Sequence, residues 1–208
     1  MPDKTNKLAL LFKEIQQDNK TAFNEFFLLY YDKLLAFAFH YTKHQESAEE
    51  ITSELFVKVW LKRTSLSNIL KPEVYLFISI KNACLNLIRA EKKRFLFFNV
   101  QSDDKQMENI ADSDGGVKME DKELKDILDQ AVAALPDQRR LIFKLIKEDG
   151  LKGHEVAVIL AISVRTVENQ LYKAVKSLAE IMSAYIGYHP QKRFSKKHIL
   201  SNMPIVFF

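Results

Sequence analysis

The chain has 208 residues, of which 47% are hydrophobic, so it can form one domain or two small ones with substantial cores. No apolar run approaches the roughly 18 residues of a membrane span, and the N-terminal residues lack a signal peptide's apolar segment, so we expect a cytoplasmic protein without direct membrane insertion. The single cysteine, Cys84, excludes a disulfide within the chain, and the small numbers of glycines and prolines indicate helices almost throughout.

The formal net charge of +4 is modest, and its distribution is more informative than its total. Residues 71–94 include six basic and two acidic residues, and residues 136–178 include eight basic and five acidic residues. Between these blocks, residues 95–126 include four basic and nine acidic residues. This alternation predicts that each basic block meets nucleic acid while the acidic middle avoids it.

The first two predicted helices pack through apolar and aromatic residues. A short amphipathic helix is indicated by four apolar residues at helical spacing, Leu8, Leu11, Phe12 and Ile15. Asp18 and Asn19 end it. A second helix, residues 21–41, has a dense aromatic stripe, for which core packing is favoured over a ligand pocket. His40 and His44 are four residues apart, but no third ligand is evident, so we expect no metal site.

The third predicted helix begins at Ser47, which forms a capping box with Glu50, and reaches about Lys62. Its apolar face contains Ile51, Leu55 and Val59. The opposite face is acidic and polar, with two aromatic residues at its margin: Glu50, Ser53, Glu54 and Lys58, beside Phe56 and Trp60. This face suits either a protein-docking surface or an ordinary solvated surface, and the residues alone favour the ordinary surface.

A loop is predicted at residues 63–71, after which Pro72 suits the first position of a helix that continues to about Arg94. One side of this helix stays polar for five turns, in a stripe opposite Phe77, Ile80, Cys84 and Leu87: Tyr75, Ser79, Asn82, Asn86, Arg89 and Lys93. The stripe has no acidic residue, and Lys92 adds to its basic end. Amides and tyrosine can bond to or stack on bases, and the basic end can hold phosphates.

The rest of the chain is predicted to form a linker, a second helical domain and a tail. Residues 95–120 are acidic and lack periodicity, and the Gly115-Gly116 pair makes this linker flexible. One helix starts near Asp121 and ends at Pro136, and the next, residues 137–148, is stopped by Gly150. Residues 188–208 form a basic tail. The predicted fold is all-α, with two small helical domains joined by an acidic flexible linker.

Residues 151–178 have the pattern of two helices joined by a tight corner at residues 161–163, where Ser163 suits an N-cap. Val156, Ala157 and Leu160 mark the inner face of the first helix. In the second helix the inner face is Val164, Val167, Leu171, Ala174 and Leu178. The outer face is rich in hydrogen-bonding groups: Arg165, Thr166, Glu168, Asn169, Gln170, Lys173 and Lys176. This arrangement favours a helix-turn-helix in the major groove of DNA over a surface helix of a bundle.

Together these segments resemble the extracytoplasmic-function (ECF) sigma factors, small bacterial initiation factors of RNA polymerase. Residues 48–60 are similar to the family segment that docks on core polymerase, and residues 75–94 to the segment that melts and reads the minus-ten element. Residues 135–140, continuing into the helix-turn-helix, resemble the minus-thirty-five reader. The resemblance implies sigma region 2 at residues 1–94 and sigma region 4 at residues 121–187. The length and basic tail look most like the sigma factors of Bacteroides-type bacteria.

The resemblance also implies roles for these side chains. Core polymerase would bind Glu50, Ser53, Glu54, Lys58 and Trp60. The minus-ten strand would be gripped by Tyr75, Ser79, Asn82, Asn86, Arg89, Lys92 and Lys93. The minus-thirty-five groove would be read by Arg165, Thr166, Glu168, Asn169 and Gln170, with phosphates held by Arg139, Arg140, Lys173 and Lys176. An anti-sigma factor is the further partner that the family implies.

Two positions depart from the family pattern. Ala161 stands where the corner usually has glycine, and Lys152 where the first helix usually starts with serine or threonine.

A conventional helix-turn-helix regulator with an N-terminal sensor domain would explain residues 162–171 equally well, but not the acid-free stripe. An enzyme is not supported, because the sequence has no Gly-rich phosphate loop, metal-ligand cluster or nucleophile beside a base. We therefore expect no cofactor and no small-molecule substrate.

Overall fold

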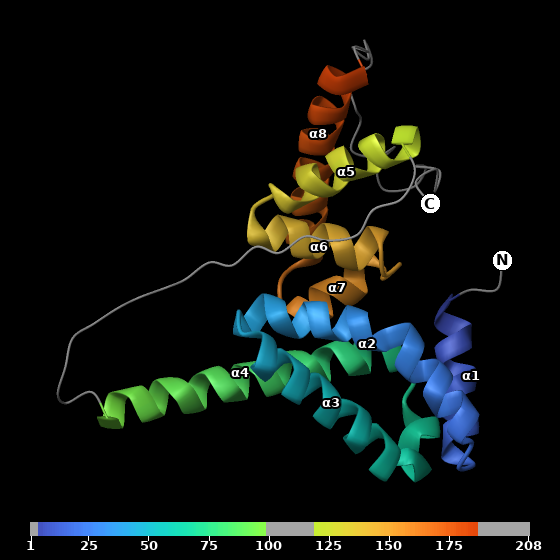
Figure 1. The fold of residues 1–208 in the computed structure, drawn as a ribbon. Helices are drawn as coiled ribbons and strands as arrows, with labels where there is room; N and C mark the ends of the chain where they lie inside the picture. Colours follow the sequence, from blue (N-terminus) through green and yellow to red (C-terminus); the bar gives the residue numbers. More distant parts are fainter. Residues whose placement is uncertain (1–3, 99–118, 187–208) are drawn as a thin grey trace. The chain divides into compact units, whose positions relative to one another are not determined.

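The computed structural model describes residues 4–98 and 119–186, and all the regular structure in them is helical. The described residues form two compact units (Figure 1). We call the helices before residue 99 unit 1 and those after residue 118 unit 2, and each is described by itself. Most of the predicted linker and the whole predicted tail lie outside the described residues.

Unit 1 contains four α-helices and a short 3-10 helix in its described part: α1 (Lys4–Gln16), α2 (Lys20–Thr42), α3 (Gln45–Leu61), η1 (Arg63–Asn68) and α4 (Pro72–Phe98). Helix α2 packs against α1, α3 and α4, so it is the central helix of the unit (Figure 1). The four apolar residues predicted for α1 are all buried. Asp18, at φ 62°, and Asn19, whose side chain caps α2, separate α1 from α2, as predicted.

The aromatic stripe of α2 forms the core of unit 1. Phe26 is fully buried, and its ring lies 5.5 Å from that of Phe12 and 4.7 Å from that of Phe56. Phe37 meets Phe77 of α4 edge to face at 5.0 Å. These contacts confirm core packing as the role of the stripe. They also correct the place predicted for Phe56, which is 3% exposed because it turns toward α2.

The predicted start of α3 is wrong. The helix begins at Gln45, with His44 at the N-cap position and no side-chain cap, so Ser47 lies inside the first turn. A capping box between Ser47 and Glu50 is therefore absent. The Thr42 hydroxyl accepts a hydrogen bond from the His44 backbone N–H at 3.4 Å, which supports the short connection from α2.

The segment between α3 and α4 is more ordered than the predicted loop. Residues 63–68 form η1, and Leu66 is 2% exposed because η1 packs against α1. Helix α4 begins at Pro72, as predicted, but continues past Arg94 to Phe98. The Glu73 side chain in its first turn is 8% exposed, and its carboxylate accepts a 2.5 Å hydrogen bond from the Tyr30 hydroxyl. This buried bond ties the start of α4 to α2.

Unit 2 contains α5 (Met119–Ala133), α6 (Asp137–Lys147), α7 (Gly153–Leu160) and α8 (Val164–Ile186) in its described part. Helix α8 packs against α5 and α6 (Figure 1). One apolar cluster joins α5 to α8: Ala131, Val132, Leu135, Ala174 and Leu178. Gly150, at φ 79°, follows α6 in the left-handed conformation that glycine adopts without strain. The two helices predicted around the corner are thus α7 and α8.

Candidate nucleic-acid and polymerase interfaces

The corner between α7 and α8 is closed by the predicted cap. The Ser163 hydroxyl oxygen accepts a hydrogen bond from the Thr166 backbone N–H at 3.0 Å and lies 2.8 Å from the Thr166 hydroxyl. Ala161 has φ 58°, the left-handed region that costs a residue with a Cβ atom about 1–2 kcal/mol. This strain explains why glycine suits the position. Lys152 gives α7 no side-chain cap, but its backbone N–H donates to the Glu155 carboxylate at 3.0 Å.

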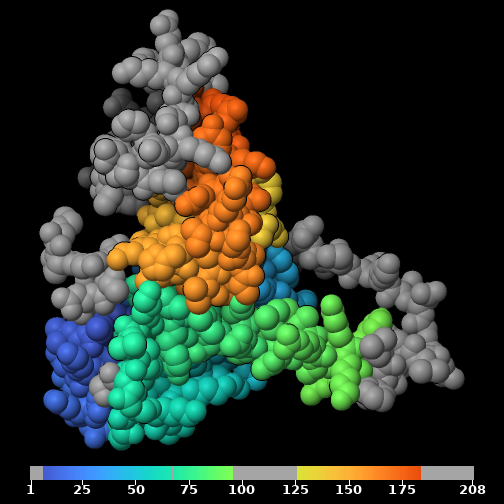
Figure 2. All heavy atoms as spheres, turned by 180° about the vertical axis from the view of Figure 1, so that it is seen from behind, coloured from blue at the N-terminus to red at the C-terminus, as the bar shows by residue number. Residues whose placement is uncertain are grey.

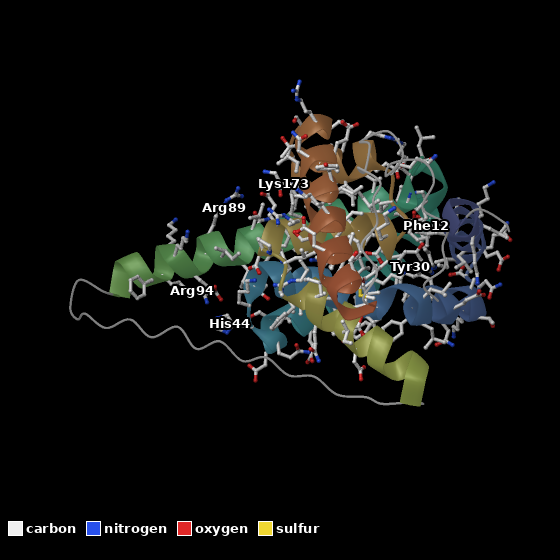
Figure 3. The ribbon with its side chains drawn as sticks, turned by 90° about the horizontal axis from the view of Figure 1, so that it is seen from above. Phe12, Tyr30, His44, Arg89, Arg94 and Lys173 are labelled. Carbon is white, nitrogen blue, oxygen red and sulfur yellow. The ribbon has the colours of Figure 1, made fainter. Side chains whose placement is uncertain are left out.

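The inner face of α8 matches the prediction except at one end. Val167, Leu171, Ala174 and Leu178 are buried, whereas Val164 is 43% exposed because it opens the helix ahead of the packed turns. On the outer face, Arg165, Glu168, Lys173 and Lys176 are exposed, and Thr166, Asn169 and Gln170 are half-buried. Figure 3 shows Lys173 on α8. The structure therefore keeps the predicted reading residues at the surface of one helix.

Three of the predicted unit 2 residues, Arg139, Arg140 and Gln170, already make hydrogen bonds within unit 2. The Arg139 guanidinium on α6 donates to the Gln170 side-chain oxygen at 3.5 Å. The Arg140 guanidinium donates to the Asp137 carboxylate at 2.5 Å and to the Ala133 carbonyl oxygen. Arg140 thereby joins the end of α5 to the start of α6. Its guanidinium has a structural function in addition to the phosphate contact that we predicted.

Tyr172 is a candidate that the sequence analysis missed. Arg165, Asn169, Tyr172 and Lys176 follow one another at spacings of four, three and four residues, so they form one stripe along α8. Tyr172 is half-buried, which leaves part of its ring at the surface beside the predicted reading residues. The helical spacing was visible in the sequence. The prediction included only charged, amide and hydroxyl side chains, so it left out the tyrosine of this stripe.

The polar stripe of α4 is exposed along nearly its whole length. Asn82, Asn86, Arg89, Lys92 and Lys93 are exposed, Tyr75 is 37% exposed, and Ser79 is half-buried. At 1.5 Å per residue, the stripe from Tyr75 to Lys93 extends about 27 Å. Figure 2 shows α4, in green, extending beyond the other helices of unit 1, and Figure 3 shows Arg89 and Arg94 on it. The Arg89 guanidinium donates to the Asn86 side-chain oxygen at 3.3 Å.

The opposite side of α4 holds the stripe in place. Phe77, Ile80 and Cys84 are at most 1% exposed, as predicted for the apolar face. The Cys84 thiol lies 3.8 Å from the Ala38 carbonyl oxygen, and burial raises its pKa to about 11. Burial also raises the pKa of Tyr41 to about 12, with a smaller contribution from the Cys84 charge. Cys84 is thus a neutral core residue at ordinary pH and is not a reactive thiol.

The outer face of α3 presents the predicted acidic residues at the surface. Glu50, Ser53, Glu54 and Lys58 are exposed, and the Lys58 ammonium pairs with the Glu54 carboxylate at 2.6 Å. Trp60 is half-buried, with its ring 5.1 Å from that of Phe23 and 4.8 Å from the Arg63 guanidinium. Two apolar residues that we did not single out lie on the same face: Val57, 57% exposed, and Leu61, 69% exposed.

Neither a metal centre nor a membrane span is found in the parts of the chain that the structure describes. Within residues 4–98 and 119–186, no three His, Cys, Asp or Glu residues are arranged to hold a metal ion. His44 is exposed at the start of α3. Among the same residues, no helix is both long and apolar enough to cross a membrane.

Two family models match this chain, in the order of the two units. Residues 26–94 match sigma-70 region 2, and residues 125–178 match sigma-70 region 4. The first match covers most of α2, all of α3 and most of α4, and the second covers the helix-turn-helix. The three surfaces described above, on α3, α4 and α8, therefore lie inside matched segments.

Similar proteins include curated sigma factors from two bacteria. The ECF RNA polymerase sigma factor SigW of Bacillus subtilis is 24% identical over 174 residues, covering 80% of this chain and 91% of that protein. The ECF RNA polymerase sigma-E factor of Escherichia coli K12 is 24% identical over 177 residues, covering 81% of this chain and 91% of that protein.

Among the solved structures that share the fold is the sigma factor RpoE of Bartonella quintana in complex with the anti-sigma factor NepR. The two chains are 20% identical, with a TM-score of 0.50, and the similarity covers 77% of this chain and 96% of that chain.

Proposed function

This chain belongs to the sigma-70 family as an ECF RNA polymerase sigma factor with regions 2 and 4, and from that premise we propose which of its surfaces perform each step of initiation. The family is not enzymatic, so the work of the chain is binding: it directs transcription initiation and contacts DNA through the region 4 helix-turn-helix. The observation that supports the proposal best is the exposed, acid-free stripe of α4, in the same chain as a capped helix-turn-helix.

Strand opening is assigned to α4. Unstacking a base costs a few kcal/mol, which stacking and amide contacts in a pocket must offset. In this proposal Asn82 and Asn86 contact the edges of exposed bases of the minus-ten element, and Tyr75 provides a ring for stacking. Arg89, Lys92 and Lys93 hold the flanking phosphates, and Ser79 adds a hydroxyl between the ring and the amides. The residue types and their exposure support this assignment.

Duplex reading is assigned to α8, in the major groove of the minus-thirty-five element. Arg165 is exposed in the first turn, where recognition helices meet base edges. The remaining polar residues of this face, with Tyr172 beside them, contact further edges or phosphates: Thr166, Glu168, Asn169, Gln170, Lys173 and Lys176. In α6, Arg139 contacts a phosphate and is held by Gln170, and Arg140 combines a phosphate contact with its bonds to Asp137 and Ala133.

Core polymerase is proposed to dock on the outer face of α3. The exposed carboxylates of Glu50 and Glu54 suit a basic partner surface, and Ser53, Lys58 and Trp60 surround them. Reversing both carboxylates, with Glu50→Lys and Glu54→Lys, should abolish co-purification with core polymerase. The fold should persist, since both positions are exposed. Co-purification of this variant at wild-type yield would place docking elsewhere.

Three further properties belong to the proposal. The acidic residues 95–120 connect the two regions, and most of this segment lies outside the described residues. An anti-sigma factor regulates the chain in the cytoplasm, an inference supported by the complex of RpoE from Bartonella quintana with NepR. The chain's length and basic tail support a relationship to the sigma factors of Bacteroides-type bacteria. The conventional-regulator alternative is not favoured, since residues 26–94 match region 2 and not a sensor domain.

Transcription in vitro tests the proposal. Core polymerase from a related bacterium should initiate on promoter DNA from upstream of the protein's own operon when this protein is added, and not without it. In a gel shift, the protein with core polymerase should bind that DNA, whereas the protein alone should bind it weakly. Tight duplex binding by the protein alone, with no stimulated transcription, would instead identify a conventional regulator.

A further inference from the structure

The outer face of α3 combines acidic residues with an exposed apolar pair. Val57 follows Ser53 and Glu54 by one turn and precedes Leu61 by one turn, so it lies at the middle of this face. The side chains of Val57 and Leu61 are 57% and 69% exposed. Single exposed apolar residues are ordinary, but two that adjoin on a face already proposed to bind a partner form a small apolar patch.

The neighbouring side chains on this face already interact within unit 1. The Glu54 carboxylate pairs with Lys58 at 2.6 Å, and both side chains are more than half exposed, so solvent screens this pair. The Trp60 ring contacts Phe23 and the Arg63 guanidinium. Val57 and Leu61 instead present apolar surface to solvent, and they lose water contact only when a partner covers them.

Protein interfaces usually have an apolar centre and a charged rim. The centre carries most of the affinity, and rim charges mainly steer association and suppress wrong partners. The outer face of α3 places an apolar pair, Val57 and Leu61, beside charged groups, with Glu50 and Glu54 on the N-terminal side of the pair and Leu61 as the last residue of the helix. We propose that Val57 and Leu61 are the affinity-determining contacts of this chain with core RNA polymerase, and that the carboxylates orient the complex. This inference rests on the proposed docking function of α3.

The proposal specifies the complementary surface on core polymerase. That surface presents apolar side chains to Val57 and Leu61, with basic groups placed toward Glu50 and Glu54. Charge contacts at the rim weaken as salt rises, whereas apolar burial does not. The affinity of the wild-type protein should therefore persist in part at high salt, and the persistent part should depend on Val57 and Leu61.

The test replaces the patch with uncharged polar residues. The double variant Val57→Gln with Leu61→Gln removes the apolar contact without adding charge, and glutamine is a good helix former. Leu28→Gln on α2 is the matched control, because Leu28 is 71% exposed and lies on another helix. Affinity for core polymerase is measured for the full-length proteins by fluorescence anisotropy at low and high salt, and circular dichroism checks the fold.

We expect the double variant to bind core polymerase about tenfold more weakly or worse at both salt concentrations, while Leu28→Gln binds like the wild type. The conservative variant Val57→Ile with Leu61→Met should retain wild-type affinity. Wild-type affinity of a folded double variant would overturn the inference. Failure of the wild-type protein itself to bind core polymerase would instead refute the proposed docking function.

Another occupant of the patch would be revealed by the same variant. Sedimentation of the free wild-type protein and of the double variant tests for a second copy of this chain. If the wild-type protein is a dimer, and the double variant is a monomer that still binds core polymerase normally, the patch joins two copies and the proposal is wrong. A monomeric wild-type protein, with the expected loss of polymerase affinity in the variant, supports it.

Discussion

Helices α4 and α8 both have one buried side and one polar side, but they hold their polar side chains differently. The α4 stripe is long, rich in amides and exposed along most of its length. On α8 the corresponding groups are partly fixed by residues outside the helix, through the Ser163–Thr166 cap and the Arg139–Gln170 bond, whereas the Arg89–Asn86 bond of α4 joins two members of the stripe itself. Side chains that are already fixed suit the regular base edges of a duplex, because they lose little further conformational entropy on binding. Exposed amides along a helix suit bases that leave the stack one at a time.

The largest expected effect comes from removing the two amides of α4. Asn82→Ala with Asn86→Ala should leave core binding and closed-complex formation nearly intact and reduce open complex on the order of tenfold to a hundredfold. Permanganate reactivity of thymines near the start site measures this. A promoter with a pre-melted bubble should restore much of the activity. Equal loss on duplex and pre-melted promoters would remove strand opening from the role of α4.

Arg165→Ala should give the opposite pattern. An arginine paired with a guanine edge contributes about 1–3 kcal/mol against the wrong base, so the variant should weaken the closed complex and relax preference at one or two base pairs. Binding to a panel of single-base promoter variants measures this, and a pre-melted bubble should give no specific rescue. Uniform weakening over all sequences would make Arg165 a phosphate contact. If this variant and the amide variant fail at the same step, the contrast between α4 and α8 is lost.

Tyr30→Phe should destabilise unit 1 alone. It removes the donor of the 2.5 Å bond to the buried Glu73 carboxylate, which should cost about 1–2 kcal/mol of unfolding free energy. Hydrogen exchange with mass spectrometry, read separately for peptides of each unit, measures the change. Loss of protection should appear in α2 and α4 and not in unit 2. Tyr31→Phe is the control, because its ring is stacked at 4.7 Å on that of Phe27 and the substitution keeps that ring.

Ala161→Gly should stabilise unit 2 alone. Glycine relieves the left-handed strain at φ 58° but has more freedom in the unfolded chain, so the net gain should be about 1 kcal/mol or less. The same exchange experiment should show increased protection in α7 and α8. Ala157→Gly is the control, since Ala157 lies inside α7 and should lose stability instead. A destabilised Ala161→Gly variant would show that the corner is not strained.

An effect confined to high pH is a loss of stability in unit 1. Burial raises the pKa of the Cys84 thiol to about 11, so the folded state disfavours the thiolate. The resulting stabilisation is complete below the ordinary thiol pKa, about 9, and is lost as the pH rises through 11. The Cys84→Ala variant should show a weaker pH dependence of chemical denaturation over this range. Equal slopes for the two proteins would contradict the assignment.

The sequence by itself determined the helical class, the two surfaces and most inner faces, because these depend on local spacing. An apolar residue every three or four positions defines a buried side wherever the helix packs, as in the buried Phe77, Ile80 and Cys84. The Ser163 cap is also local, since its bond spans three residues. The same rule could have identified Tyr172 as part of the α8 stripe.

Only the tertiary structure decided features that depend on distant residues. Phe56 is in the core because the rings of α2 surround it, and Glu73 is buried because Tyr30, 43 residues earlier, donates to it. Helix α3 begins at Gln45, after a connection that the Thr42 hydroxyl supports. The predicted loop contains η1, in which Leu66 is buried because η1 packs against α1. Val164 was assigned to the inner face by its spacing, yet it is exposed at the helix end. Periodicity locates a helix face, but only the packed neighbours determine which part of that face loses contact with water.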